Sequence, residues 1–398
     1  MNDRCRQPSA AAWVRLAGLV PPVLRRRFRR QWLAYVPLLF HLIWLMLRFR
    51  SVTLFTAANP GIANGGAAGE SKSASLEKLR RLEGVVPEYL VVPANLEPSA
   101  RLRSVQQWME RRQVSFPIVL KPDVGERGRA VAVARDHDEL VQGLRRMRER
   151  AIVQCFVDGV EFGIFYLRMP KEPVGQILSI TEMIHPTVVG NGRTTLGDLL
   201  RAGPWIAARA AAQGVFDAAR LRSVPAAGER VHLFELGFYS HDAVFVDRRD
   251  LRTPALERRI ETISRSHPGF FIGRFDVIAP NADAVRVARF KVIELNGVVS
   301  EQTHIYDPAT GIVQAFRVLR RQWSNAFSIG AANCAQGARP TPALVLLRLI
   351  WRRFVEHFDD DARVVLHFRR KAARHACIHD PARIEKSARG VSGHKAQF

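Results

Sequence analysis

The sequence predicts a fold of mixed helices and strands, on three observations. Short apolar, β-branched runs alternate with helical segments over much of the chain, an order that favours an α/β architecture. A chain of 398 residues is long enough to bury a sizeable core and to form two or three lobes. Its 47% hydrophobic and 24% charged residues lie in the ordinary range for globular proteins.

The expected elements follow from periodicity and from turn residues between the runs. Period-two or continuous apolar runs predict strands at 51–56, 89–92, 116–121, 129–134, 151–156, 161–167, 270–278 and 290–296. Helical spacing, or Ala- and Arg-rich composition, predicts helices at 71–81, 99–112, 138–150, 191–222, 256–266, 310–329 and 344–358.

The charge is unusual for such a composition. The formal net charge is +23, and only eight of the 60 basic residues are lysines. The excess suits an anionic partner such as a membrane surface, polyphosphate or nucleic acid, and a genomic bias toward Arg explains it equally well. The four cysteines, Cys5, Cys155, Cys334 and Cys377, form no CxxC pair and no zinc spacing, which predicts free thiols in a reducing compartment.

Residues 20–50 form a basic and apolar segment. Arg25–Arg30 precede an apolar run, Trp32–Leu47, that Pro37 and His41 interrupt and that is shorter than the ~20 residues of a membrane span. Three interpretations stay open: a helix packed on the body, an interfacial helix on anionic lipid, and a transmembrane span.

Four polar residues on two predicted strands carry the most chemical information. Arg274 and Asp276 share one face of the strand at 270–278, and Glu294 and Asn296 share one face of the strand at 290–296. If the strands are neighbours, oxygen ligands that suit Mg²⁺ converge beside a cation that suits phosphate. The alternative is a salt-bridged strand pair without a ligand.

A second pattern places a lysine before a glycine-containing loop. Lys121 ends an apolar strand, and Gly125 and Gly128 follow before the next strand. Lys is a compact charge for phosphate, and glycines let a backbone approach phosphate oxygens. A hairpin with a solvated Lys is the alternative. The earlier glycine-rich run at 65–72 is not a Walker A motif, because Glu70 stands where the lysine belongs. Two interpretations of it stay open: a turn that binds an anion through backbone N–H groups, and a plain loop.

A strand–turn–strand unit follows. The backbone from Gln154 to Val157 offers N–H and C=O groups to an adenine edge, and Glu161 offers a carboxylate to ribose hydroxyls. A plain hairpin with an exposed Glu is the alternative.

In this order, the motifs resemble the ATP-grasp superfamily, and most closely its carboxylate–amine ligase branch with D-alanine–D-alanine ligase and cyanophycin synthetase. The resemblance covers roughly residues 85–325. The segment Val188–Leu196 is also similar to the Gly-Asp-Gly-basic-Thr segment of cyanophycin-synthetase-like enzymes, with Asn191 in place of Asp.

The resemblance implies an α+β fold in which two α+β lobes sandwich ATP, preceded by a short N-terminal α/β segment. The implied parts are a basic and apolar helical segment at 1–50, a truncated α/β segment at 51–115, a small lobe at 116–190, a large lobe with a helical insert at 191–330, and a C-terminal helix with a basic tail at 331–398.

The resemblance also implies a role for each motif. The ATP-binding residues would be Lys121, Gly125, Gly128, Gln154, Val157 and Glu161. Asp276, Glu294 and Asn296 would hold Mg²⁺, with Mn²⁺ as an alternative, and Arg274 would act on the transferred phosphoryl group as the catalytic residue. The family often has another lysine ahead of Lys121, for which Lys72 and Lys78 are the candidates.

The implied function is an ATP- and Mg²⁺-dependent ligase that activates a carboxylate as an acyl phosphate for attack by an amine. The expected partners are small-molecule carboxylates and amines, with peripheral membrane association through residues 20–50 and without nucleic acid. The expected location is the cytoplasm, at the inner membrane face if that association holds. Two alternatives are a small-molecule kinase and a basic membrane-surface or nucleic-acid-binding protein without catalysis.

Overall fold

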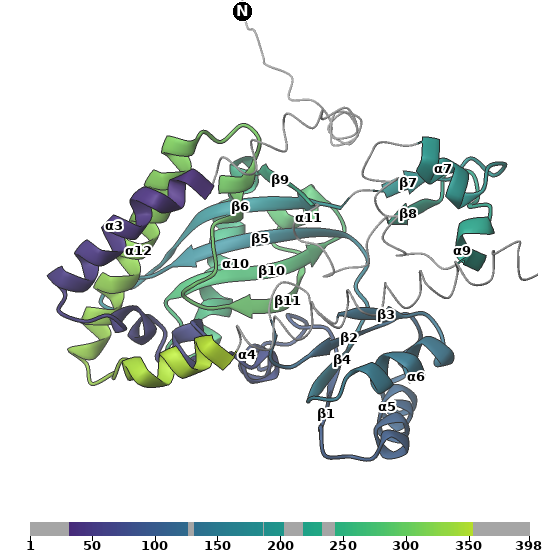
Figure 1. Cartoon of the computed structure of the whole chain (residues 1–398), viewed down its shortest axis with the longest axis horizontal. Helices are drawn as coiled ribbons and strands as arrows, with labels where there is room; N and C mark the ends of the chain where they lie inside the picture. Colours follow the sequence, from purple (N-terminus) through teal and green to yellow (C-terminus); the bar gives the residue numbers. More distant parts are fainter. Residues whose placement is uncertain (1–31, 126–130, 186, 203–217, 233–242, 353–398) are drawn as a thin grey trace, which may run out of the picture. The chain divides into compact units, whose positions relative to one another are not determined.

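A computed structural model describes residues 32–125, 131–185, 187–202, 218–232 and 243–352 (Figure 1). The chain divides into two compact units, residues 1–342 and residues 343–398. In the first unit, helices pack on antiparallel sheets, so the expected α+β class is confirmed.

The larger sheet has five strands in the order β11-β10-β5-β6-β9, and every neighbouring pair is antiparallel. Its strands are β5 (Val160–Leu167), β6 (Gln176–Ile184), β9 (Val244–Asp247), β10 (Ile272–Ala279) and β11 (Lys291–Asn296). Helices α10 (Pro254–Ser266) and α11 (Ala282–Arg286) bury their apolar residues against one face of this sheet. Among the described residues, that cluster is the largest apolar core.

The smaller sheet has four strands in the order β1-β4-β2-β3. They are β1 (Tyr89–Val92), β2 (Ile118–Pro122), β3 (Ala132–Ala134) and β4 (Ala151–Cys155). Helices α5 (Pro98–Arg112) and α6 (His137–Arg146) pack on it in a second apolar cluster. The expected division between residues 115 and 116 runs through this unit, because β1 pairs with β4 and α5 shares the core.

The segment before α4 (Lys72–Leu79) contains two 3₁₀ turns, η2 (Leu54–Ala58) and η3 (Ala63–Gly66). The predicted strand at 51–56 is therefore wrong. Within that stretch the N–H of Ser51 donates to the carbonyl of Met46 at 3.1 Å and the N–H of Thr56 donates to the carbonyl of Thr53 at 2.9 Å, so local turns, and not a neighbouring strand, satisfy this backbone.

The predicted helix at 191–222 is described only at its ends, α7 (Leu196–Ala202) and α9 (Ala218–Arg222), beside the small sheet of β7 (Thr187–Val189) and β8 (Arg230–His232). Two further 3₁₀ turns are η4 (Arg249–Leu251) and η5 (Thr303–Tyr306). In the second unit, residues 343–352 are helical, as expected for the start of the helix at 344–358.

The N-terminal apolar run forms η1 (Trp32–Ala34) and α3 (Tyr35–Arg48). Helix α3 packs along α12 (Ile312–Cys334), which also covers part of the five-stranded sheet (Figure 1). Pro37 lies in the first turn of α3, where a missing N–H breaks no helical hydrogen bond. In the described part of the chain, no helix combines the length and hydropathy of a membrane span.

Candidate active site

The pairing of β10 with β11 brings the four predicted polar residues to one face of the sheet. Arg274 lies opposite Asn296, and Asp276 lies opposite Glu294. Residues directly opposite each other in an antiparallel pair point the same way, and alternation keeps both pairs on one side. The convergence expected from the sequence is confirmed.

A β-bulge lies beside these pairs. The register shifts after Asp276, so that Val277 faces Val292 and Ile293 has no opposite residue. The extra residue lets Val292 and Leu295, three positions apart, both enter the apolar core. The carbonyl of Ile293 accepts from Lys121 Nζ at 2.9 Å, which joins the five-stranded sheet to the smaller one.

Arg274 and Asp276 form a two-pronged ion pair. Arg274 Nε and Nη2 donate to the two oxygens of Asp276 at 2.6 and 3.0 Å, and Asn296 Nδ2 donates to Asp276 Oδ2 at 2.7 Å. Burial lowers the pKa of Arg274, but the Asp276 carboxylate outweighs it and holds that pKa above its usual range. The Arg–Asp ion pair at i, i+2 that this alternative invokes is thus present within β10.

Lys72, the first residue of α4, lies against Glu294. Its Nζ is 3.2 Å from Glu294 Oε1 and also donates to the carbonyl of Gly125. Burial raises the pKa of Glu294, but Lys72 and Lys121 outweigh it and hold that pKa below its usual range. Of the two candidates for the additional family lysine, Lys72 joins this cluster, whereas Lys78 donates to the carbonyl of Gly61.

Lys121 comes from β2 and is buried. Its Nζ donates to Gln154 Oε1 at 2.8 Å, and burial lowers its pKa to about 8. The Gln154 amide nitrogen is buried and has no hydrogen-bond acceptor among the described residues. This N–H donor is unsatisfied, and an acceptor atom of a ligand would complete its hydrogen bond.

Asp123, which no sequence motif singled out, fixes α4 to the loop after β2. Its carboxylate accepts from the Ser73 backbone N–H at 2.7 Å and from the Ser71 hydroxyl at 2.9 Å, while its carbonyl accepts from the Lys72 N–H at 2.9 Å. A carboxylate at a helix N-terminus satisfies free N–H groups and suits the helix dipole. Asp123 therefore positions Lys72. A short polar residue after a predicted strand is too common a signal to have identified it.

Strand β5 extends the polar face with Glu161 and Gly163. Gly163 lies opposite Asp276, and a Cβ at Gly163 would come within 3.1 Å of Arg274 Cδ. The missing side chain leaves room for the Arg274 side chain to cross the strand. Glu161, two residues away on the same face, pairs with His185 Nε2 at 2.9 Å.

The glycine-rich run before α4 packs against the end of β11. A Cβ at Gly66 would stand 2.4 Å from Gly297 Cα, and the N–H of Val298 donates to the carbonyl of Gly65 at 3.0 Å. Gly65 and Gly66 both have positive φ angles, of 66° and 81°. Close backbone approach therefore accounts for these glycines without a phosphate.

The loop after β11 contacts Arg274 from the other side. The carbonyl of Glu301 accepts from Arg274 Nη1 at 3.3 Å, and its carboxylate accepts from the hydroxyls of Tyr35 and Tyr306. Burial and the Glu301 charge raise the pKa of Tyr35, which keeps its hydroxyl protonated. This cluster joins the start of α3 to the candidate site.

The remaining predicted residues are placed as follows. Gly125 lies at the start of the loop and accepts from Lys72, and Val157 is half-buried in the turn between β4 and β5. Gly128 lies outside the described residues.

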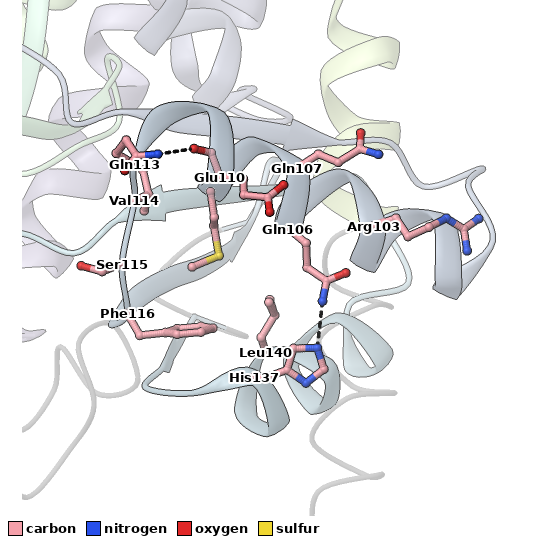
Figure 2. A pocket seen from close by; sticks show the side chains of 11 residues that line it. Arg103, Gln106, Gln107, Glu110, Gln113, Val114, Ser115, Phe116, His137 and Leu140 are labelled. Atoms are coloured by element: carbon pink, nitrogen blue, oxygen red, sulfur yellow. Dashed lines mark hydrogen bonds between the residues drawn. The ribbon is translucent and has the colours of Figure 1, made fainter.

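A surface groove between α5 and α6, where Gln106 contacts His137, contains none of the predicted site residues (Figure 2).

Among the described residues, no group of three His, Cys, Asp or Glu side chains is arranged to hold a metal ion. The β10–β11 face instead offers two carboxylates and one amide. That set is typical of Mg²⁺ sites completed by phosphate oxygens and water.

Comparisons with known proteins give distant likenesses. No model of a protein family and no curated protein matches the sequence. Among solved structures, D-alanine–D-alanine ligase from Bacillus anthracis is 14% identical, with 67% of this chain and 69% of that chain covered and a TM-score of 0.39. VanG D-Ala:D-Ser ligase from Enterococcus faecalis is 11% identical, with 64% and 61% covered and a TM-score of 0.37. L-amino acid ligase from Bacillus licheniformis is 16% identical, with 68% and 50% covered and a TM-score of 0.36. Likenesses at this level do not by themselves assign a family or an activity to the chain.

Proposed function

We propose that this protein is an ATP- and Mg²⁺-dependent ligase of the ATP-grasp type that joins a carboxylate to an amine. The observation that carries the proposal is the meeting of Asp276, Glu294 and Asn296 with two buried lysines. The oxygen ligands lie on the five-stranded sheet, and the lysines come from α4 and β2. Ionisable groups whose pKa values are shifted by burial and by a specific charge partner, as for Lys121 and Glu294, occur often at active sites.

The residues fit a magnesium nucleotide. Asp276, Glu294 and Asn296 would hold Mg²⁺, or Mn²⁺, which supplies positive charge to the phosphate oxygens that the lysines also face. Lys121 and Lys72 would bind phosphates, and the free amide nitrogen of Gln154 has a hydrogen bond to give. The backbone from Gln154 to Val157 as the adenine contact and Glu161 as the ribose contact are part of the proposal.

In the proposed reaction, a carboxylate oxygen attacks the γ-phosphorus of ATP, the bond to the β,γ-bridging oxygen breaks, and ADP leaves. The amine then attacks the carbonyl carbon of the acyl phosphate, inorganic phosphate leaves, and the nitrogen loses a proton. Arg274 would leave its pair with Asp276 and stabilise the negative charge of the transferred group. The loop of Gly125 and Gly128 would exclude water from the acyl phosphate.

Calorimetry with Mg²⁺-ATP tests the proposal. We expect the wild-type protein to bind the nucleotide only in the presence of the metal and Glu294→Ala to lose that binding. Glu172→Ala, which removes an exposed carboxylate, is the matched control. The proposal is contradicted if the wild-type protein does not bind Mg²⁺-ATP, or if Glu294→Ala binds it with unchanged affinity.

Product analysis separates the ligase from the two alternatives. A ligase releases ADP and free phosphate when a carboxylate and an amine are both present, whereas a kinase releases ADP and a stable phosphorylated compound. A basic binding protein without catalysis shows steeply salt-dependent binding to polyanions that Asp276→Asn leaves unchanged.

The proposal leaves nucleic acid out of the partners and retains the cytoplasm as the expected location. The described cysteines, Cys155 and Cys334, are free thiols. Peripheral membrane association through residues 20–50 is also retained, and helix α3 is the described part of that segment.

A further inference from the structure

We infer that the outer face of α3 is a docking surface for an anionic lipid membrane. The helix has two apolar sides. One side, with Leu38 and Leu45, is buried against α12. The other side is open and presents Val36, Leu39, Phe40, Ile43, Trp44 and Leu47, each between 45% and 72% exposed.

The exposed residues form a continuous stripe along the helix. Val36, Phe40, Ile43 and Leu47 follow the spacing i, i+4, i+7, i+11, which places them on one face of an α-helix. Scattered single apolar residues on a surface are ordinary, but a contiguous stripe of this size marks a surface that another apolar body covers. We therefore expect another apolar surface to cover this stripe.

The sequence on either side of α3 carries charge of one sign. From Arg4 to Gly69 the sequence contains ten arginines and no Asp or Glu. Arg48 and Arg50 are exposed at the C-terminal end of α3, with the Arg48 guanidinium 5.4 Å from the centre of the Trp44 ring. On α12, Arg320 is exposed and lies beside His41 of α3, where its charge helps burial to lower the pKa of His41.

This combination fits the phosphate headgroups of an anionic lipid surface. Apolar side chains enter the boundary between headgroups and acyl chains, Trp favours that boundary, and arginines pair with lipid phosphates. At 14 residues, α3 is about 21 Å long, shorter than the ~30 Å hydrocarbon core, so it would lie in the plane of the membrane. A second copy of the chain would bring two arginine-rich surfaces together, which electrostatic repulsion opposes.

The helix is held in place for docking. Besides its packing on α12, the Tyr35 hydroxyl donates to Glu301, and His41 Nε2 lies 2.9 Å from Ser324 Oγ. These contacts fix the rotation of α3 about its axis, so that the exposed stripe points away from the body. Docking then requires no rearrangement of the helix.

Flotation of the full chain with lipid vesicles tests the inference. We expect binding to vesicles of phosphatidylglycerol and phosphatidylcholine, weak binding to pure phosphatidylcholine, and release at high salt as screening grows. Phe40→Ser with Trp44→Ser should lower the bound fraction by about tenfold or more, because both side chains enter the lipid. The matched control, Val174→Ser with Val287→Ser, changes two other exposed apolar residues and should bind like the wild type.

A second measurement tests lipid contact without the double variant, which could lose vesicle binding by misfolding. Brominated acyl chains should quench part of the tryptophan emission of the wild type, and Trp44→Phe should keep vesicle binding but lose most of that quenching. A full chain that fails to bind anionic vesicles overturns the inference. So does a dimer in solution that the Phe40→Ser and Trp44→Ser changes dissociate, because a second copy then covers the stripe.

Discussion

The two faces of the β10–β11 pair are built by alternating residues of the same strands, yet they are satisfied in different ways. Phe275 and Leu295 lie opposite each other on one face and are buried among apolar side chains from α10 and neighbouring strands. On the other face, Asp276 and Glu294 lie opposite each other and are neutralised by cations. The apolar face is complete by packing alone, whereas the polar face holds charges that a ligand can rearrange.

The comparison teaches where stability and function separate on one element. The apolar face gains free energy from area removed from water. On the polar face, the burial of charges costs free energy even when the charges are paired, so this face contributes less to stability. Changes on the first face should act on folding, and changes on the second should act on nucleotide chemistry.

The largest effect is expected from the apolar face. Phe275→Ala removes a fully buried ring from the main core and should lower the free energy of unfolding by about 3–5 kcal/mol. Urea denaturation measures this loss. Phe40→Ala, on the 68% exposed ring of α3, should change the same quantity by less than about 0.5 kcal/mol. Equal losses in the two variants would show that burial of Phe275 in the apolar face does not stabilise the fold.

The next effect is expected from the polar face. Asp276→Asn removes a charged oxygen from the proposed metal site while keeping an acceptor for Arg274, and should lower Mg²⁺-dependent ADP release by about 10²–10³-fold. Asp283→Asn, at a carboxylate that is 93% exposed, should leave the rate unchanged. Full activity of Asp276→Asn would show that the Asp276 carboxylate on this face takes no part in the reaction.

A smaller effect is expected from pH. The pKa of buried Lys121 lies near 8, below its ordinary value, so its charged form is lost as pH rises through that value. The dissociation constant for ATP should then rise by up to about tenfold per pH unit above pH 8, because phosphate favours the charged lysine. Lys121→Arg should flatten this rise between pH 7 and 10, since Arg stays charged. Calorimetric titrations across that range measure both proteins.

The smallest effect is expected from an ion pair outside this strand pair. Arg252 and Glu257 contact each other at 2.5 Å, with side chains 49% and 37% exposed. Arg252→Ala should lower the free energy of unfolding by less than about 1 kcal/mol, because solvent screens the pair. A thermal melt that shows a larger loss would mean that exposed pairs here resemble the buried Arg274–Asp276 pair.

Several features of the site were predictable because they depend on short-range patterns. Alternation along a strand fixes that Arg274 shares a face with Asp276 and that Glu294 shares one with Asn296. Lys121 stood out as one of only eight lysines, at the end of an apolar strand. Other features depend on contacts between distant residues. Asp123 belongs to no pattern that marks a site, the family resemblance does not choose between Lys72 and Lys78, and the bulge at Ile293 exists because Val292 and Leu295 both enter one core.

The sequence by itself determined the mixed helix and strand content, the polar faces of the two strands and the presence there of oxygen ligands of the kind that suits Mg²⁺, because side-chain period and chemistry are local properties. The tertiary structure decided which cations meet those ligands, why the run at 61–69 is rich in glycine, and which side of α3 is buried. Those outcomes depend on which surfaces pack together, and an apolar helix such as α3 carries no local signal for the side that its neighbour will cover.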